Sequence, residues 1–137
     1  MARIEVVAGI IVDQQSRILL AQRASHQHQG GKWEFPGGKI EAGEDAQQAL
    51  ARELHEELDI VVEPQYCQLF SQVSFDYPDK QVSLGFYIIK QFTGIPKGVE
   101  GQPLAWVTKQ HCQAYTLPQA NQPVLDKLLT DWPMGLN

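Results

Sequence analysis

The chain has 137 residues, of which 43% are hydrophobic and 20% are charged, and its formal net charge is −5. This length suits one domain with a substantial core, and the negative charge disfavours duplex DNA or an anionic membrane as a partner. Two cysteines, Cys67 and Cys112, are too few for a disulfide framework and lack metal-ligand spacing. Because neither a signal peptide nor a membrane-spanning apolar run is visible, we expect one cytoplasmic domain over residues 1–137.

The first forty residues predict short strands separated by polar segments. A run rich in Val and Ile at residues 4–12 indicates a buried strand, and residues 18–23 indicate its return after a turn at residues 13–16. A polar loop over residues 24–32 precedes a third short strand at residues 33–35. The glycine-rich residues 36–38 are interpreted as a turn.

A helix is predicted over about residues 45–58, with Glu44 or Asp45 near its start, where negative charge is favoured. Its apolar residues recur at a spacing of four and form one buried stripe: Leu50, Leu54 and Leu58. Its carboxylates at i, i+3 and i+4 share another face: Glu53, Glu56 and Glu57. The helix therefore packs inward along one seam and directs an acidic face elsewhere.

The second half of the chain changes to the period of two that is typical of strands. Residues 66–75 and 82–92 predict two strands around a turn at residues 77–80, and a loop over residues 93–102 carries Glu100. A short strand at residues 104–107, a weakly patterned segment and a last helix at about residues 122–130 follow. The predicted fold class is α/β or α+β, with a mixed sheet and two helices.

The acidic helix face has two interpretations. Charged stripes on helices are commonly solvated, and Arg52 could pair with Glu56, although Arg before Glu is the weaker orientation and such a pair contributes only about 0.2–0.5 kcal/mol. Three clustered carboxylates repel one another unless a cation lies between them. Oxygen ligands of this kind suit Mg²⁺ or Mn²⁺ rather than zinc.

The spacing of the polar residues resembles the Nudix box. Gly38 is followed after five residues by Glu44, after seven more by the run Arg52-Glu53-Leu54-His55-Glu56-Glu57, and then by Asp59-Ile60. All charged positions match, and one position departs, since the family has Gly where this chain has Asp59. A Gly there would end the helix in the left-handed conformation, which Asp tolerates better than most residues. The resemblance implies the Nudix fold, a mixed β-sheet sandwiched between helices.

Segments outside the box are similar to the MutT branch of the family over nearly the whole chain, notably residues 7–11, 33–41, 100–103 and 120–124. That resemblance implies a Mg²⁺-dependent pyrophosphohydrolase, with Mn²⁺ able to substitute, that converts 8-oxo-dGTP to 8-oxo-dGMP and pyrophosphate and so cleans the nucleotide pool. The alternatives are a Nudix enzyme for CTP or other pyrimidine triphosphates and a non-catalytic module that recognises damaged bases. The complete set of box carboxylates argues against the non-catalytic module, because a binding module has no use for a metal cluster. We expect a monomer whose partner is a nucleotide, without stable binding to nucleic acid or membrane.

The resemblance also assigns metal ligands and catalytic residues. The implied ligands are the Gly37 carbonyl and the three box carboxylates, Glu53, Glu56 and Glu57. Glu100 resembles a further acidic group near the metals, with a solvated loop glutamate as the alternative. We expect Glu53 to act as the base that activates water and Arg52 to orient Glu53 or its neighbours.

Substrate contacts rest on the same resemblance. Arg23 and Lys39 could contact phosphates, and His28 resembles a position near the substrate, although each could be an ordinary surface residue. Phe35 could line the purine pocket or belong to the core. Asn121 is placed on the base, but it is also a good helix N-cap before Pro123. The resemblance adds three neighbours from one segment to the substrate-binding set: Glu34, Pro36 and Gly37.

Overall fold

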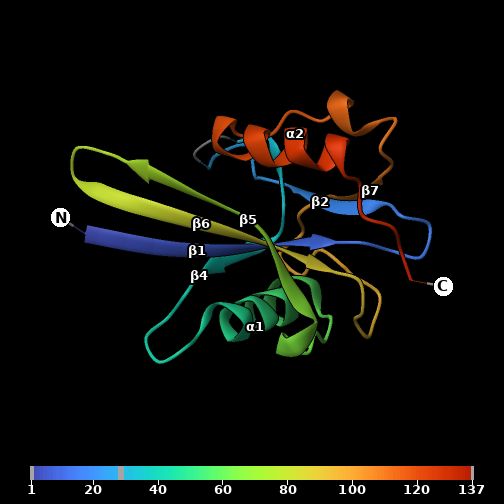
Figure 1. The fold of residues 1–137 in the computed structure, drawn as a ribbon, viewed down its shortest axis with the longest axis horizontal. Helices are drawn as coiled ribbons and strands as arrows, with labels where there is room; N and C mark the ends of the chain where they lie inside the picture. The colour runs from blue at the N-terminus through green and yellow to red at the C-terminus, as the bar shows by residue number, and fades with distance from the viewer. Residues whose placement is uncertain (1, 28–29, 137) are drawn as a thin grey trace.

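The computed structural model describes residues 2–27 and 30–136, and its strands form two sheets between two helices (Figure 1). The first sheet is mixed, with the order β4 (Gly37–Lys39), β1 (Ala2–Ile11), β6 (Lys80–Ile89), β5 (Cys67–Asp76). In it β1 and β6 are parallel from Ala2 opposite Lys80 to Ile11 opposite Ile89, whereas the two outer pairs are antiparallel. The second sheet is antiparallel, with the order β3 (Trp33–Glu34), β2 (Ile18–Gln22), β7 (Leu104–Val107).

The two helices cover opposite sides of these sheets, α1 (Ala46–Leu58) on one side and α2 (Gln122–Thr130) on the other (Figure 1). Three short 3₁₀ turns complete the described elements: η1 (Pro64–Tyr66), η2 (Cys112–Ala114) and η3 (Gln119–Asn121). The fold class is the predicted one, and the bounds of β7 and α2 agree with the prediction. Among the described residues, no helix has both the length and the apolar content needed to cross a membrane.

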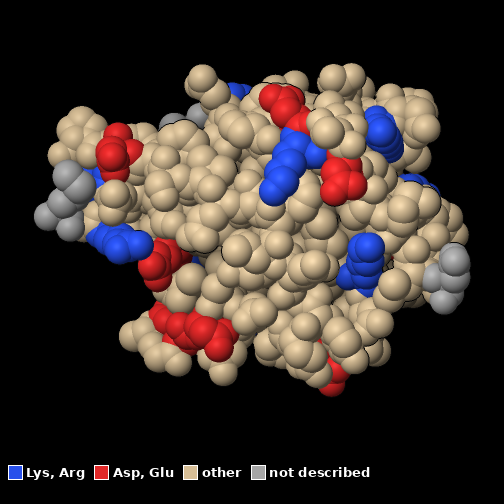
Figure 2. Space-filling model, viewed as in Figure 1, with Lys and Arg blue, Asp and Glu red and all other residues tan. Residues whose placement is uncertain are grey.

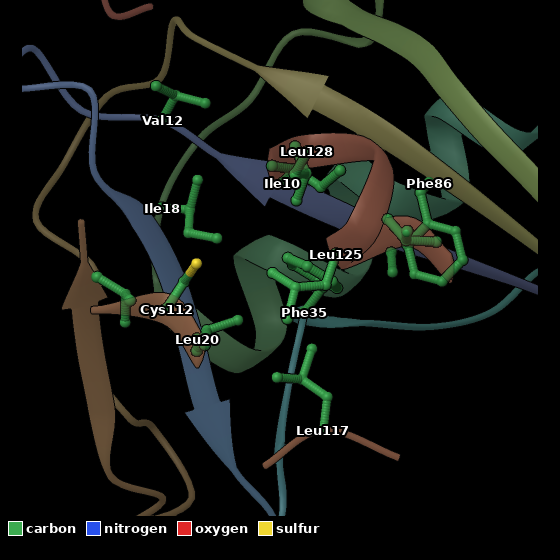
Figure 3. Packing of buried hydrophobic residues seen from close by; sticks show 13 residues of the cluster. Ile10, Val12, Ile18, Leu20, Phe35, Phe86, Cys112, Leu117, Leu125 and Leu128 are labelled. Carbon is green, nitrogen blue, oxygen red and sulfur yellow. The ribbon is translucent and has the colours of Figure 1, made fainter. Parts of the chain in front are cut away.

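The core consists of two apolar clusters, one on each side of the sheets. Ile10 of β1 packs with Phe86 and with Leu125 and Leu128 of α2 (Figure 3). Its neighbour Ile11 belongs to the cluster beneath α1. Because consecutive residues of a strand point to opposite faces, β1 is buried on both sides, which explains its uninterrupted Val- and Ile-rich run.

Helix α1 is held at both ends by local chemistry. Asp45 caps its start, because the Asp45 side chain accepts from the Gln48 N–H at 2.8 Å while the Gln48 side chain accepts from the Asp45 N–H at 3.0 Å. This reciprocal pair is a capping box. The helix ends at Asp59 in the left-handed conformation, with φ 56° and ψ 38°. Its predicted stripe, Leu50, Leu54 and Leu58, is fully buried.

One predicted element is wrong: residues 36–38 do not form a turn. Gly37–Lys39 is strand β4, which pairs antiparallel with β1 so that Gly37 lies opposite Ala8. A Cβ on Gly37 would lie 2.0 Å from the Val7 carbonyl oxygen. The glycine therefore serves a close approach of two strands rather than a reversal of the chain.

Candidate active site

Arg52 of α1 connects the acidic face of the helix to the segment before it. Its Nε and Nη2 donate to the two Glu44 oxygens at 2.7 and 3.0 Å, and Nη2 also donates to the Lys39 carbonyl at 3.1 Å. Nη1 donates to Glu53 at 3.0 Å and, less closely, to Glu56 at 3.4 Å. The forked pair with Glu44 lowers the pKa of that carboxyl. Arg52 is thus placed to orient Glu53, and its pairing with Glu56 is the weakest of these contacts.

Two carboxylates of this helix, Glu53 and Glu57, are crowded by other carboxylates and partly removed from water. Desolvation raises the pKa of Glu57 to about 8, with further contributions from the negative charges of Glu53, Glu34 and Glu100, while a hydrogen bond from the Gly37 N–H opposes the shift. Desolvation also raises the pKa of Glu53, against the lowering effect of Arg52. Carboxylates from three parts of the chain, α1, β3 and the loop before β7, therefore act on Glu57 at this site.

A cleft of about 230 Å³ lies beside these carboxylates. Strands β2 and β3 contribute one wall, where Arg23 Nη1 donates to Glu34 Oε2 at 2.6 Å. Helix α1 contributes Glu57, and the loop before β7 contributes Glu100. The structure thus brings five predicted site residues to one cleft, with a guanidinium and carboxylates along its walls: Arg23, Glu34, Pro36, Glu57 and Glu100.

The donor chemistry of the site fits a divalent cation. Oxygen ligands are what Mg²⁺ and Mn²⁺ prefer. A cation would relieve the repulsion between carboxylates that, in addition to desolvation, raises the pKa of Glu57. As the side chains lie, no group of three His, Cys, Asp or Glu side chains in the described part of the chain is close enough to enclose an ion. Arg52 instead engages Glu53 and Glu56. Binding an ion between the box carboxylates would require them to turn toward one another.

Further predicted site residues in the described part of the chain do not line the cleft. Phe35 is 3% exposed and packs edge-on against Phe86 with ring centroids 5.8 Å apart, so it belongs to the core cluster shown in Figure 3. Lys39 is exposed on β4 and is not among the lining residues. Asn121 occupies the N-cap position of α2, as expected, but its side chain makes no capping hydrogen bond, so the side-chain capping role is wrong. His28 lies outside the described residues.

Sequence reasoning missed three glutamines that line the cleft, Gln22, Gln27 and Gln102. The first two shape the loop after β2, since Gln22 Nε2 donates to the Gly31 carbonyl at 3.0 Å and Gln27 Oε1 accepts from the Ala24 N–H at 3.2 Å. Glutamines in polar segments show no periodic pattern in the sequence that would mark them as site residues. Only the similarity of residues 100–103 to the MutT branch pointed toward one of them.

Comparison with known proteins agrees with this geometry. The family model described as NUDIX domain matches residues 7–127. The chain is 40% identical to the 8-oxo-dGTP diphosphatase of Escherichia coli, covering 93% of this chain and 98% of that one, and 36% identical to the CTP pyrophosphohydrolase of Escherichia coli, covering 94% and 93%. A solved structure from work on MutT of Aliivibrio salmonicida and Vibrio cholerae superposes with a TM-score of 0.82 at 43% identity, over 93% of this chain and 98% of that chain.

Proposed function

The chain belongs to the NUDIX domain family, and we propose that it hydrolyses 8-oxo-dGTP to 8-oxo-dGMP and pyrophosphate. It is a Nudix hydrolase that acts on nucleoside triphosphates, and the relatives named 8-oxo-dGTP diphosphatase, at 40% and 41% identity over 128 residues each, support this substrate. Removal of oxidised nucleotides from the precursor pool would be its role.

One observation carries the proposal: α1, β3 and the loop before β7 supply carboxylates to the cleft that also holds Arg23. A triphosphate needs cationic partners for its oxygens and a base for the attacking water. Arg23 supplies a guanidinium suited to phosphate oxygens. The box carboxylates supply the base and sites for a cation.

The resemblance to the MutT branch implies that water attacks the β-phosphorus. The bond between the β-phosphorus and the oxygen that bridges it to the α-phosphorus breaks, and the nucleoside monophosphate leaves as pyrophosphate forms. We assign Glu53 as the group that takes the proton from water. Its desolvation raises its pKa and makes it a stronger base than an exposed glutamate, and Arg52 fixes its position at 3.0 Å.

Mg²⁺ is the proposed cofactor, with Mn²⁺ able to replace it. Its holders would be Glu53, Glu56, Glu57 and Glu100 together with the Gly37 carbonyl. Bound there, the ion would neutralise phosphate charge.

A substrate panel tests the proposal. We would measure pyrophosphate release with Mg²⁺ from 8-oxo-dGTP, dGTP, CTP and dCTP, with EDTA as the control. A kcat/KM that is highest for 8-oxo-dGTP is the expected result. The relative named CTP pyrophosphohydrolase, at 36% identity, makes CTP the second candidate, and a higher kcat/KM for CTP would establish it instead. The absence of turnover with any nucleotide would contradict an enzyme altogether.

We further propose a cytoplasmic monomer that forms no stable complex with nucleic acid. The net charge of −5 disfavours stable binding to nucleic acid. On the face in Figure 2, basic and acidic side chains are interspersed, and the described residues form no continuous basic stripe there. Both cysteines are free and buried, in keeping with a reducing compartment.

A further inference from the structure

The loop that carries Glu100 is bonded to the C-terminal end of α1. The Val99 N–H donates to the Glu57 carbonyl at 3.1 Å, and the Lys97 N–H donates to the Leu58 carbonyl at 3.0 Å. The last carbonyls of a helix have no partner within the helix. The loop satisfies these carbonyls and at the same time brings Glu100 to the cleft that Glu57 lines.

Gln102 joins both parts of this arrangement through one side chain. Its Nε2 donates to the Glu57 carbonyl at 3.2 Å, and its Oε1 accepts from the Glu100 N–H at 2.9 Å. A carboxamide presents a donor and an acceptor side by side, so the two contacts use its two ends. The backbone of Glu100 is thereby tied to the backbone of Glu57.

We propose that Gln102 is a positioning residue that holds Glu100 beside Glu57 at the mouth of the cleft. This inference rests on the proposed function, because it concerns how the loop carboxylate serves the same site. Glu100 is exposed, so its side chain has little packing to fix it. The bond to its own N–H therefore restricts the backbone segment that carries Glu100.

The side-chain chemistry of Gln102 suggests the informative substitution. Methionine has a similar length and shape and neither a donor nor a strong acceptor, so Gln102→Met removes both bonds and keeps the volume. Gln65→Met is the matched control, since Gln65 is exposed and its side chain makes one long contact, 3.4 Å, with Glu63.

The experiment is a double-mutant cycle between Gln102→Met and Glu100→Gln. The first readout is Mn²⁺ alone titrated into nucleotide-free protein, and the second is kcat and KM for 8-oxo-dGTP. Loss of a residue that supports a metal ligand typically costs 10–100-fold, so we expect Gln102→Met to weaken Mn²⁺ binding and lower kcat by about tenfold, with KM little changed. In the Glu100→Gln background the same substitution should have no further effect, and Gln65→Met should change neither readout.

Two results would overturn the inference. One is an unchanged Mn²⁺ affinity in Gln102→Met, and the other is an equal loss with and without Glu100, which would show an effect that does not pass through Glu100. Melting temperatures establish that each variant folds. If Gln102→Met does not fold, Gln102→Ala replaces it in the same cycle. If the parent protein hydrolyses no triphosphate, the proposed function fails, whereas the Mn²⁺ cycle still tests Gln102 by itself.

Discussion

The Glu53 carboxylate occupies the space that a side chain at position 38 would fill. A Cβ added to Gly38 would lie 2.4 Å from Glu53 Cδ and 2.6 Å from each carboxylate oxygen. Non-bonded heavy atoms essentially never lie within 3.0 Å of a Cβ. The missing side chain at Gly38 therefore allows the proposed base of α1 to lie against strand β4.

Gly38→Ala should impair catalysis and leave the fold intact. The nearest atoms are the end of a flexible side chain, so Glu53 moves away and the strand does not. A misplacement of about 1 Å can cost about 10²-fold in rate, and we expect a fall in kcat of that order with a nearly unchanged Tm. Gly37→Ala is the contrast, because its Cβ would meet the Val7 carbonyl oxygen at 2.0 Å. This variant should lose stability, and an equal Tm for both would contradict the assignment.

Glu53→Gln should retain the fold and still bind the metal through the other proposed ligands, Glu56, Glu57 and Glu100, but lose most turnover. The change keeps the shape of the side chain and removes its charge and basicity. Loss of a general base typically costs about 10²–10⁴-fold, and we expect kcat for 8-oxo-dGTP to fall within this range. Circular dichroism and Mn²⁺ titration provide the controls. Turnover within about threefold of the parent would remove Glu53 from the role of base.

Glu57→Gln should stabilise the protein in EDTA. The pKa of Glu57 is raised to about 8 from 4.5, chiefly by desolvation, so the folded state binds the proton more tightly than the unfolded state. Stability is then greatest at acidic pH and declines as the pH rises toward 8. The amide removes this decline, and we expect a Tm gain of roughly 2–5 °C near pH 8.5 and little gain near pH 5.5. Glu63→Gln, on an exposed residue, is the control; an equal gain there would refute the explanation.

Asp59→Gly should be neutral or mildly stabilising. Asp59 has φ 56° and ψ 38° at the end of α1, a conformation that glycine adopts without strain. The change removes an ion pair with Lys97 at 3.0 Å, but an exposed pair contributes only about 0–1 kcal/mol. Lys97→Met removes the same pair and keeps the left-handed aspartate, so it isolates this loss. A fall of several degrees in the Tm of Asp59→Gly alone would reveal an additional role of Asp59.

Asn121→Ala should reduce the preference for 8-oxo-dGTP over dGTP. Guanine presents O6 and N7 acceptors, and oxidation at C8 places a hydrogen on N7, so a carboxamide can donate to O6 and accept from N7–H. With ordinary guanine the amide oxygen faces a lone pair, an unmatched contact worth about 1–3 kcal/mol. We expect the ratio of kcat/KM values to fall by about tenfold.

The structure separates this role from capping, because Asn121 makes no side-chain capping bond. The Tm of Asn121→Ala should therefore stay close to that of the parent, without the loss of about 1 kcal/mol that removal of a cap brings. Gln119→Ala, in the same 3₁₀ turn, is the control. An unchanged substrate ratio would exclude Asn121 from base recognition.

The sequence by itself determined the elements whose signals are local. Helix α1 begins at a capping box, buries leucines spaced four apart and carries its three glutamates on one face, all within fifteen residues. Strand β7 and helix α2 agree with their predicted bounds for the same reason. The carboxylates of α1 could be predicted to lie together because helical periodicity fixes which side chains are neighbours.

Only the tertiary structure decided which distant residues meet. Residues 37–39 form a strand because β1 pairs with them, and Phe35 belongs to the core because Phe86 packs on it. Arg52 makes its shortest hydrogen bond to Glu44, which is eight residues away in the sequence. Gln102 bonds the Glu57 carbonyl across 45 residues. Such contacts depend on how strands pair and how loops close, and this is set by the packing of the whole chain rather than by the pattern of any one segment.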